Sequence, residues 1–112
     1  MPELPEVETI VRALRRPLIG RTITGMRIDW PRHIATPSPD ELRHRIHGCK
    51  FESISRRAKY LVFTLTQGET LIIHLKMSGH LAVVPRAEPA DKHVHTVFEL
   101  GNGHELRFRD IR

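Results

Sequence analysis

The chain has 112 residues, of which 39% are hydrophobic and 28% charged, as expected for one small water-soluble domain with a modest core. Lysine and arginine number 18 against 13 acidic residues, and the resulting net charge of +5 and pI near 10.1 favour a polyanionic partner, nucleic acid first. A lone cysteine, Cys49, excludes an intrachain disulfide and a multi-cysteine zinc site, and the sequence contains no apolar run long enough for a transmembrane helix and no evident signal peptide.

Two helices are predicted, one before and one after the first predicted strand. Four aliphatic residues recur at helical spacing over residues 5–16 and predict an amphipathic helix there. Pro17 and Gly20 are expected to end it. A capping-box pattern that starts at Ser38 predicts a second, shorter helix over residues 39–46.

The remaining segments alternate apolar and polar residues, as strands do. Two turn signals, Gln67-Gly68-Glu69 and Gly101-Asn102-Gly103, each predict a hairpin. This pattern predicts a mainly β fold of the α+β class, an antiparallel β-sandwich with flanking helices. Strands are predicted over residues 23–30 (with an irregularity at Gly25), 51–55, 60–66, 70–75, 80–84, 94–100 and 104–109, and an exposed loop over 85–91.

The first residues offer an unusual nucleophile. Removal of Met1 would leave Pro2 with a free secondary amine beside the carboxylate of Glu3. An α-amino group has a pKa roughly two to three units below that of lysine, so part of it is unprotonated near neutral pH. Such an amine can attack an electrophilic carbon and form an iminium while a carboxyl group moves the proton. Because many proteins begin Met-Pro without this chemistry, the start alone favours an inert interpretation.

Two short segments hold further candidates. Arg56, Arg57 and Lys59 precede an apolar strand. A run of charged residues usually forms a solvent-exposed loop, and phosphate binding is the alternative. In His74-Leu75-Lys76-Met77-Ser78-Gly79, Met77 falls at the tip of a turn, which is a poor position for a core residue. Apolar wedges of this kind part stacked bases in DNA. The alternative is that Met77 folds back onto the core.

Histidines and arginines near the end of the sequence complete the set. His93 and His95 share one face if they lie on a strand, but no further ligand has the spacing of a metal site. His93 is therefore a candidate phosphate contact or a surface residue. Arg107 and Arg109 are expected on one face of the last strand. Arg112 follows as a phosphate contact, or as a residue that replaces an extruded base.

Together these segments resemble the bacterial formamidopyrimidine-DNA glycosylase family, also called MutM. The residues that carry the resemblance are Pro2-Glu3-Leu4-Pro5-Glu6-Val7-Glu8-Thr9, Arg56-Arg57-Ala58-Lys59-Tyr60-Leu61, His74-Leu75-Lys76-Met77-Ser78-Gly79, Lys92-His93-Val94-His95 and Arg109-Asp110-Ile111-Arg112. The resemblance runs through the whole chain. Its opening segment is more similar to this family than to the related endonuclease VIII branch.

The resemblance implies a catalytic set. Pro2 would be the nucleophile that attacks C1′ of the damaged nucleotide, Glu3 would be the acid and base, and Lys59 would contact phosphate and assist elimination. The implied activity is removal of oxidised purines, such as 8-oxoguanine and formamidopyrimidines, followed by strand cleavage through β,δ-elimination. The resemblance thus implies a DNA glycosylase and AP lyase of base-excision repair.

The resemblance also implies a DNA-binding set. His93 and Arg112 would hold the DNA backbone, and Met77 with Arg112 would fill the gap left by the flipped base. His74 and Arg57 are further DNA-binding candidates. The implied partner is double-stranded DNA with oxidised purines or abasic sites, bound by a monomer in the bacterial cytoplasm, at the nucleoid and not at a membrane.

The match also implies that residues 1–112 are the N-terminal catalytic domain of a longer enzyme. The family's helix–two-turn–helix region and four-cysteine zinc finger have no counterpart in this sequence, so we expect no metal and no cofactor in the chain. One alternative is a DNA-binding fragment without catalysis, either because the C-terminal clamp is missing or because a retained Met1 would make the Pro2 nitrogen an inert amide. Another is a basic β-sandwich that binds a protein through a strand edge.

Overall fold

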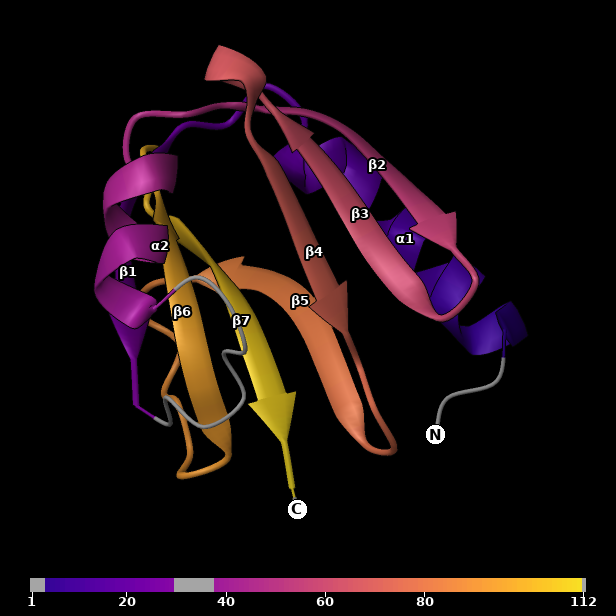
Figure 1. Ribbon diagram of the computed structural model, residues 1–112. Helices are drawn as coiled ribbons and strands as arrows, with labels where there is room; N and C mark the ends of the chain where they lie inside the picture. The colour runs from indigo at the N-terminus through magenta and orange to yellow at the C-terminus, as the bar shows by residue number, and fades with distance from the viewer. Residues whose placement is uncertain (1–3, 30–37, 112) are drawn as a thin grey trace.

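The structure of the chain, a computed structural model, describes residues 4–29 and 38–111. Within that range the chain forms two α-helices, one short 3-10 helix and seven strands, arranged as in Figure 1. In chain order they are α1 (Leu4–Leu18), β1 (Ile23–Ile28), α2 (Pro39–Ile46), β2 (Phe51–Arg57), β3 (Tyr60–Leu65), the short 3-10 helix η2 (Thr66–Gly68), β4 (Thr70–His74), β5 (Gly79–Pro85), β6 (Val94–Leu100) and β7 (His104–Asp110). Each predicted helix and strand is confirmed, with ends that shift by one or two residues, and Trp30 lies outside the described range.

The strands form two antiparallel sheets, one in the order β1-β6-β7-β5 and the other in the order β2-β3-β4. In Figure 1 the two sheets face each other across the core. The pairing of β1 with β6 shifts register between Ile23 and Gly25, which confirms the irregularity predicted at Gly25. An added Cβ at Gly25 would meet Oε2 of Glu99 at 2.8 Å, a contact that the flexible Glu99 side chain can relieve by moving. The predicted antiparallel β-sandwich with an N-terminal helix is confirmed.

Helix α1 closes one side of this sandwich. It packs against β2 of the smaller sheet and β5 of the larger one. Its buried stripe ends with Leu18, which has no exposed surface. The prediction that Pro17 ends the helix was wrong, because the helix includes Pro17 and ends at Leu18. Burial of Leu18 and a 3.0 Å bond from the Ile19 N–H to the Arg15 carbonyl hold the last turn in place.

Helix α2 follows its sequence signals closely. The Ser38 hydroxyl accepts a hydrogen bond from the Glu41 N–H at 3.3 Å, as the capping pattern predicts. The helix packs on β1, and Arg45 on its last turn pairs with Glu69 before β4 at 2.6 Å. Among the described residues, no helix is both long and apolar enough to span a membrane.

The core lies between the sheets and beneath α1. Phe51 and Phe63, both fully buried, meet edge to face with ring centroids 5.8 Å apart. Burial of one such side chain contributes roughly 1.5–3 kcal/mol. Cys49 is also completely buried. This core fixes the register of both sheets, and therefore the positions of the turns that join them.

The outer face of the larger sheet holds a buried ion pair. Arg107 and Arg109 share that face, as expected, but only Arg109 is exposed. The loop at 86–91, itself exposed as predicted, folds over Arg107, whose guanidinium donates to the Glu88 carbonyl at 2.7 Å. Arg107 also pairs with Glu105 at 3.0 Å, and both side chains are less than a tenth exposed.

Replacement of Arg107 by alanine should therefore destabilise the domain strongly. It would leave the Glu105 carboxylate buried without a partner, which typically costs about 3–5 kcal/mol. Urea unfolding measures the loss. Arg12→Ala is the matched control, because the Arg12–Glu8 pair is exposed and should contribute little. The account is contradicted if Arg107→Ala costs no more than Arg12→Ala.

Candidate functional site

The antiparallel order of the strands brings several chain turns to one end of the sandwich. In Figure 1 the turn from β4 to β5, the start of β6 and the end of β7 lie at the bottom, and the turn from β2 to β3 lies at the right, joined to the end of β4 by the pair of Tyr60 and His74. Helix α1 also begins there. The described candidates Arg57, Lys59, His74, Met77 and His93 all belong to these segments.

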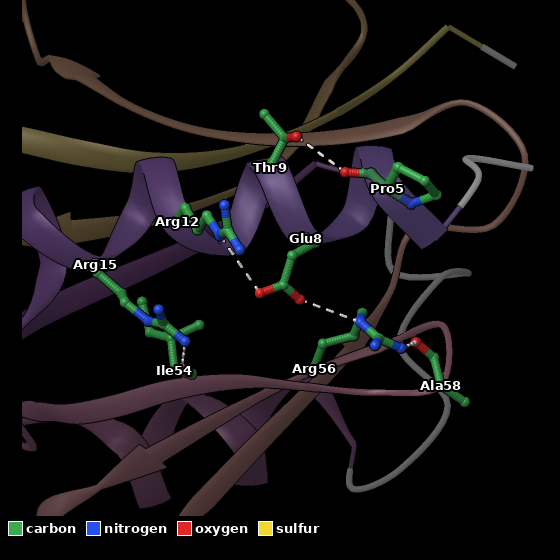
Figure 2. Close-up of polar contacts among 8 residues, drawn as sticks. All are labelled: Pro5, Glu8, Thr9, Arg12, Arg15, Ile54, Arg56 and Ala58. Atoms are coloured by element: carbon green, nitrogen blue, oxygen red, sulfur yellow. Dashed lines mark hydrogen bonds and ion pairs between the residues drawn. The ribbon is translucent and has the colours of Figure 1, made fainter.

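The turn that carries Lys59 is tight and is fastened to α1. Arg57 pairs with Tyr60, so the turn consists of Ala58 and Lys59, and Ala58 has a φ of 54°. The guanidinium of Arg56 donates to the Glu8 carboxylate at 3.2 Å and to the Ala58 carbonyl at 3.0 Å. Figure 2 shows Arg56 between helix and turn, with Glu8 also facing Arg12. The first turns of α1 therefore set the position of Lys59.

The basic segment thus divides into one structural cation and two exposed ones. Glu8 neutralises Arg56. Arg57 and Lys59 are both exposed, and within the described ranges neither forms an ion pair with an acidic residue. From the sequence, Lys59 was assigned to catalysis and Arg57 to DNA binding, and Arg56 was given no separate role. Only the fold separates the residue that anchors the turn from the two that offer positive charge to a ligand.

The turn that carries Met77 is closed at its base. Leu75 is buried, and its carbonyl accepts the Gly79 N–H at 2.8 Å. At the tip, the Met77 side chain is 59% exposed, so the alternative in which it folds back onto the core was wrong. Lys76 has a φ of 59°, and its N–H donates to Nδ1 of His74 at 3.0 Å.

His74 joins the two turns. It is the last residue of β4 and pairs with Tyr60, the first residue of β3. The two rings lie 4.8 Å apart between centroids. Because Tyr60 directly follows Lys59, this contact places the base of the Met77 turn beside the Lys59 turn. His74 is half-buried, with one ring nitrogen engaged inside the turn.

His93 lies directly before β6, and its backbone is hydrogen-bonded through both its N–H and its carbonyl. Its N–H donates to the Asp91 carboxylate at 2.9 Å, and its carbonyl accepts the Asp110 N–H at 2.9 Å. Asp91 also pairs with Arg109 at 2.7 Å. Hydrogen bonding from Arg109, with the His93 N–H second, lowers the pKa of Asp91 and keeps it charged, while Asp91 raises the pKa of Arg109.

His95 has a different role from His93. It is 8% exposed, and its Nε2 lies 2.8 Å from the Asp110 carbonyl oxygen. The pairing of β6 with β7 shifts register between Val94 and Thr96, and such bulges re-aim side chains. Within residues 4–29 and 38–111, no group of three or more His, Cys, Asp or Glu side chains is arranged to hold a metal ion.

A contact that the sequence did not predict ties the Met77 turn to β7. The Ser78 hydroxyl donates to the Asp110 carboxylate, and Gly79 pairs with Asp110 in the sheet. Sequence gives no sign of this bond, because the partners are 32 residues apart. A hollow of about 430 Å³ lies elsewhere, between the 86–90 loop and the outer face of the larger sheet, and none of the predicted site residues lines it.

Three predicted site residues lie outside the described part of the chain. These are Pro2, Glu3 and Arg112. Pro2 and Glu3 directly precede α1 in the sequence, and Arg112 directly follows the last described residue, Ile111.

Comparison with known proteins gives a consistent match. The family model of the formamidopyrimidine-DNA glycosylase N-terminal domain matches residues 1–112. Formamidopyrimidine-DNA glycosylase of Herpetosiphon aurantiacus is 48% identical over all of this chain and 41% of its own length. The Bacillus subtilis protein of the same name is 42% identical, again over all of this chain and 41% of its own length. The chain therefore spans about two fifths of these curated relatives.

Solved structures agree with the sequence match. The Lactococcus lactis protein Fpg, in complex with DNA containing an abasic site, superposes with a TM-score of 0.93 at 33% identity, over 99% of this chain and 41% of that one. The same protein in complex with DNA containing Fapy-dG gives a TM-score of 0.92 at 34% identity, over 98% of this chain and 41% of that one.

Gly79→Ala tests how the Met77 turn is built. An added Cβ would collide with the Leu75 carbonyl oxygen and approach the Phe108 ring to 3.0 Å. We expect a loss of stability on the order of 2 kcal/mol, because backbone must move. Gly101→Ala is the matched control, since its Cβ would make an ordinary contact with Thr24 at 3.5 Å. Equal melting temperatures for the two variants would contradict this reading of the turn.

Proposed function

The chain belongs to the formamidopyrimidine-DNA glycosylase family, whose N-terminal domain it matches, and from that premise we propose that it is the catalytic domain of a DNA glycosylase and AP lyase. The observation that carries the proposal is the gathering of Lys59, Met77 and His93 at the end of the sandwich where α1 begins. A terminal amine, a mobile cation, an apolar wedge and a phosphate contact are the parts that this reaction requires. The substrate is duplex DNA with oxidised purines or abasic sites.

The first chemical step uses the Pro2 amine. Its lone pair forms a bond to C1′ of the damaged nucleotide, while the bond from C1′ to the base breaks and the base leaves with that electron pair. The Glu3 carboxylate takes the N–H proton of the adduct. The nitrogen lone pair then forms the iminium as the bond from C1′ to O4′ breaks, and Glu3 returns the proton to O4′. The iminium draws electrons from C2′. Loss of a C2′ proton expels the 3′ phosphate, and a second elimination expels the 5′ phosphate.

Lys59 assists at the phosphates. An ammonium on a flexible stem can follow a leaving phosphate and stabilise its charge. Exposure at the tip of its turn, and the absence of an acidic partner in the described ranges, support this role. The hydrogen bonds of Arg56 also support this role of Lys59. They hold the turn beside α1, so the Lys59 side chain is not needed for that purpose.

The remaining candidates bind DNA. Arg57, His74 and His93 contribute charge and hydrogen bonds to the backbone, which gives a salt-dependent affinity that does not depend on sequence. A base cannot be attacked at C1′ while it is stacked, so it must be extruded from the helix. Met77 fills the space together with Arg112. Exposure of Met77 at the tip of a closed turn supports this role.

Glu3→Gln tests the reaction assigned to the site. We expect excision of 8-oxoguanine from a duplex to fall by at least about a hundredfold, in line with the usual contribution of a general acid or base. Binding to damaged DNA should persist. Gel separation of cleaved oligonucleotides and fluorescence anisotropy give the two readouts. An unchanged excision rate would remove Glu3 from the mechanism, and a wild-type chain that binds without excision would indicate a DNA-binding module.

Lys59→Ala should weaken strand cleavage by about tenfold or more and leave the melting temperature unchanged, because the side chain is exposed. It should also lower the slope of log affinity against log salt by about one. Lys50→Ala is the matched control, since it removes the same charge from an exposed residue at the other end of β2. A large drop in melting temperature for Lys59→Ala, or equal cleavage by the two variants, would assign Lys59 a structural or a generic role.

A further inference from the structure

Asp110 is bonded to two of the segments that the proposed function assigns to DNA. Its carboxylate accepts a hydrogen bond from the Ser78 hydroxyl, next to Met77 in sequence. Its backbone N–H donates to the His93 carbonyl at 2.9 Å. Its own carbonyl oxygen lies 2.8 Å from Nε2 of the buried His95. One residue thus joins the Met77 turn to the His93 segment.

The Met77 turn needs such a tie because it crosses between the sheets. It leaves β4 in the three-stranded sheet and enters β5 in the four-stranded sheet. Its base is fixed by the bond from Gly79 to Leu75, but Lys76 and Met77 at its tip are exposed. The Ser78 hydroxyl bonds this tip to β7. A hydrogen bond to a charged acceptor is about twice as strong as a neutral one.

The His93 segment, which Asp110 joins to the Met77 turn, is also held by hydrogen bonds. The backbone of His93 is bonded to Asp91 through its N–H and to Asp110 through its carbonyl. Asp91 is in turn paired with Arg109, the neighbour of Asp110. A displacement of Asp110 along β7 would therefore move the backbone of His93 and the anchor of the Met77 turn together.

We propose that Asp110 is a positioning residue that couples insertion of the Met77 turn to the phosphate contact made by His93. This inference rests on the proposed function of those two residues. In the free protein the bond from Ser78 to Asp110 holds the Met77 turn in the orientation that DNA binding requires. Binding of the lesion therefore does not have to order the turn, and the conformational entropy lost on binding is smaller. Loss of the bond lowers the preference for damaged DNA and leaves the charge-driven affinity for undamaged DNA in place.

The first test compares Ser78→Ala with Ser78→Thr, which keeps the hydroxyl, and with Ser53→Ala, which removes a hydroxyl from an exposed position in β2. Anisotropy measures affinity for a duplex with a tetrahydrofuran abasic site and for the same duplex undamaged. We expect Ser78→Ala to lose about tenfold in affinity for the abasic duplex only, and both other variants to keep the wild-type preference. Equal losses on both duplexes, or none, would overturn the coupling.

A double-mutant cycle separates positioning from a merely structural role. If Ser78 acts through Met77, the Met77→Ala/Ser78→Ala variant should bind the abasic duplex no more weakly than Met77→Ala alone. Additive losses would refute the proposal. If the wild-type chain shows no preference for the abasic duplex, the proposed function itself fails, and the inference fails with it.

A third measurement needs no DNA. Amide hydrogen exchange of the free chain reports the bonds that Asp110 and His93 donate through their N–H groups. We expect Ser78→Ala to speed exchange at both amides several-fold, and Ser53→Ala to leave them unchanged. Wild-type exchange at both amides in Ser78→Ala would show that the link is absent, whatever the DNA-binding function proves to be.

Discussion

The pairing of β7 with β5 on one side and β6 on the other is the constraint on which the candidate site depends. Gly79 at the start of β5 pairs with Asp110 at the end of β7, and Val94 at the start of β6 pairs with Arg109. Because these pairs are antiparallel, the turn before β5, the segment before β6 and the chain after β7 must meet. The smaller sheet adds the Lys59 turn through the pair of Tyr60 and His74. Ordinary hydrogen-bond register therefore brings together side chains far apart in sequence.

The basic residues of the chain fall into two groups, those paired with acidic residues and those exposed at the candidate site. Arg56, Arg107 and Arg109 are engaged by Glu8, Glu105 and Asp91, so three of the arginines are neutralised within the fold. Lys59 and Arg57 remain exposed at the end of the sandwich where α1 begins. In our account the paired arginines set the shape of the site, and Lys59 and Arg57, which have no acidic partner among the described residues, bind the polyanion. Under the proposed function, the local arrangement of charge, more than its sum, determines where DNA binds.

Sequence alone predicted much of the fold, because helical and strand periodicity reflect burial that the structure confirms. The capping box at Ser38 and the irregularity at Gly25 are local signals of the same kind. Local signals were misleading where tertiary packing was stronger. Pro17 was expected to end α1, but the helix continues to Leu18, whose side chain is fully buried. The bonds from Arg56 to Glu8 and from Ser78 to Asp110 were invisible because they join residues 48 and 32 positions apart. The sequence left open whether Met77 is exposed or folds back onto the core, and the structure shows it exposed. The roles of Pro2, Glu3 and Arg112 rest on chemistry and family resemblance.

Borohydride trapping of the chain with an oligonucleotide that carries an abasic site tests the central claim most directly. An iminium between the Pro2 nitrogen and C1′ would be reduced to a stable amine, and peptide mapping would locate the adduct. Intact-mass measurement first establishes that Met1 has been removed, and a preparation that retains Met1 is the matched control. We predict an adduct at Pro2 in the Met-free chain and none in the control. A folded, Met-free chain that gives no adduct, or one that is trapped at a lysine instead, would contradict the account.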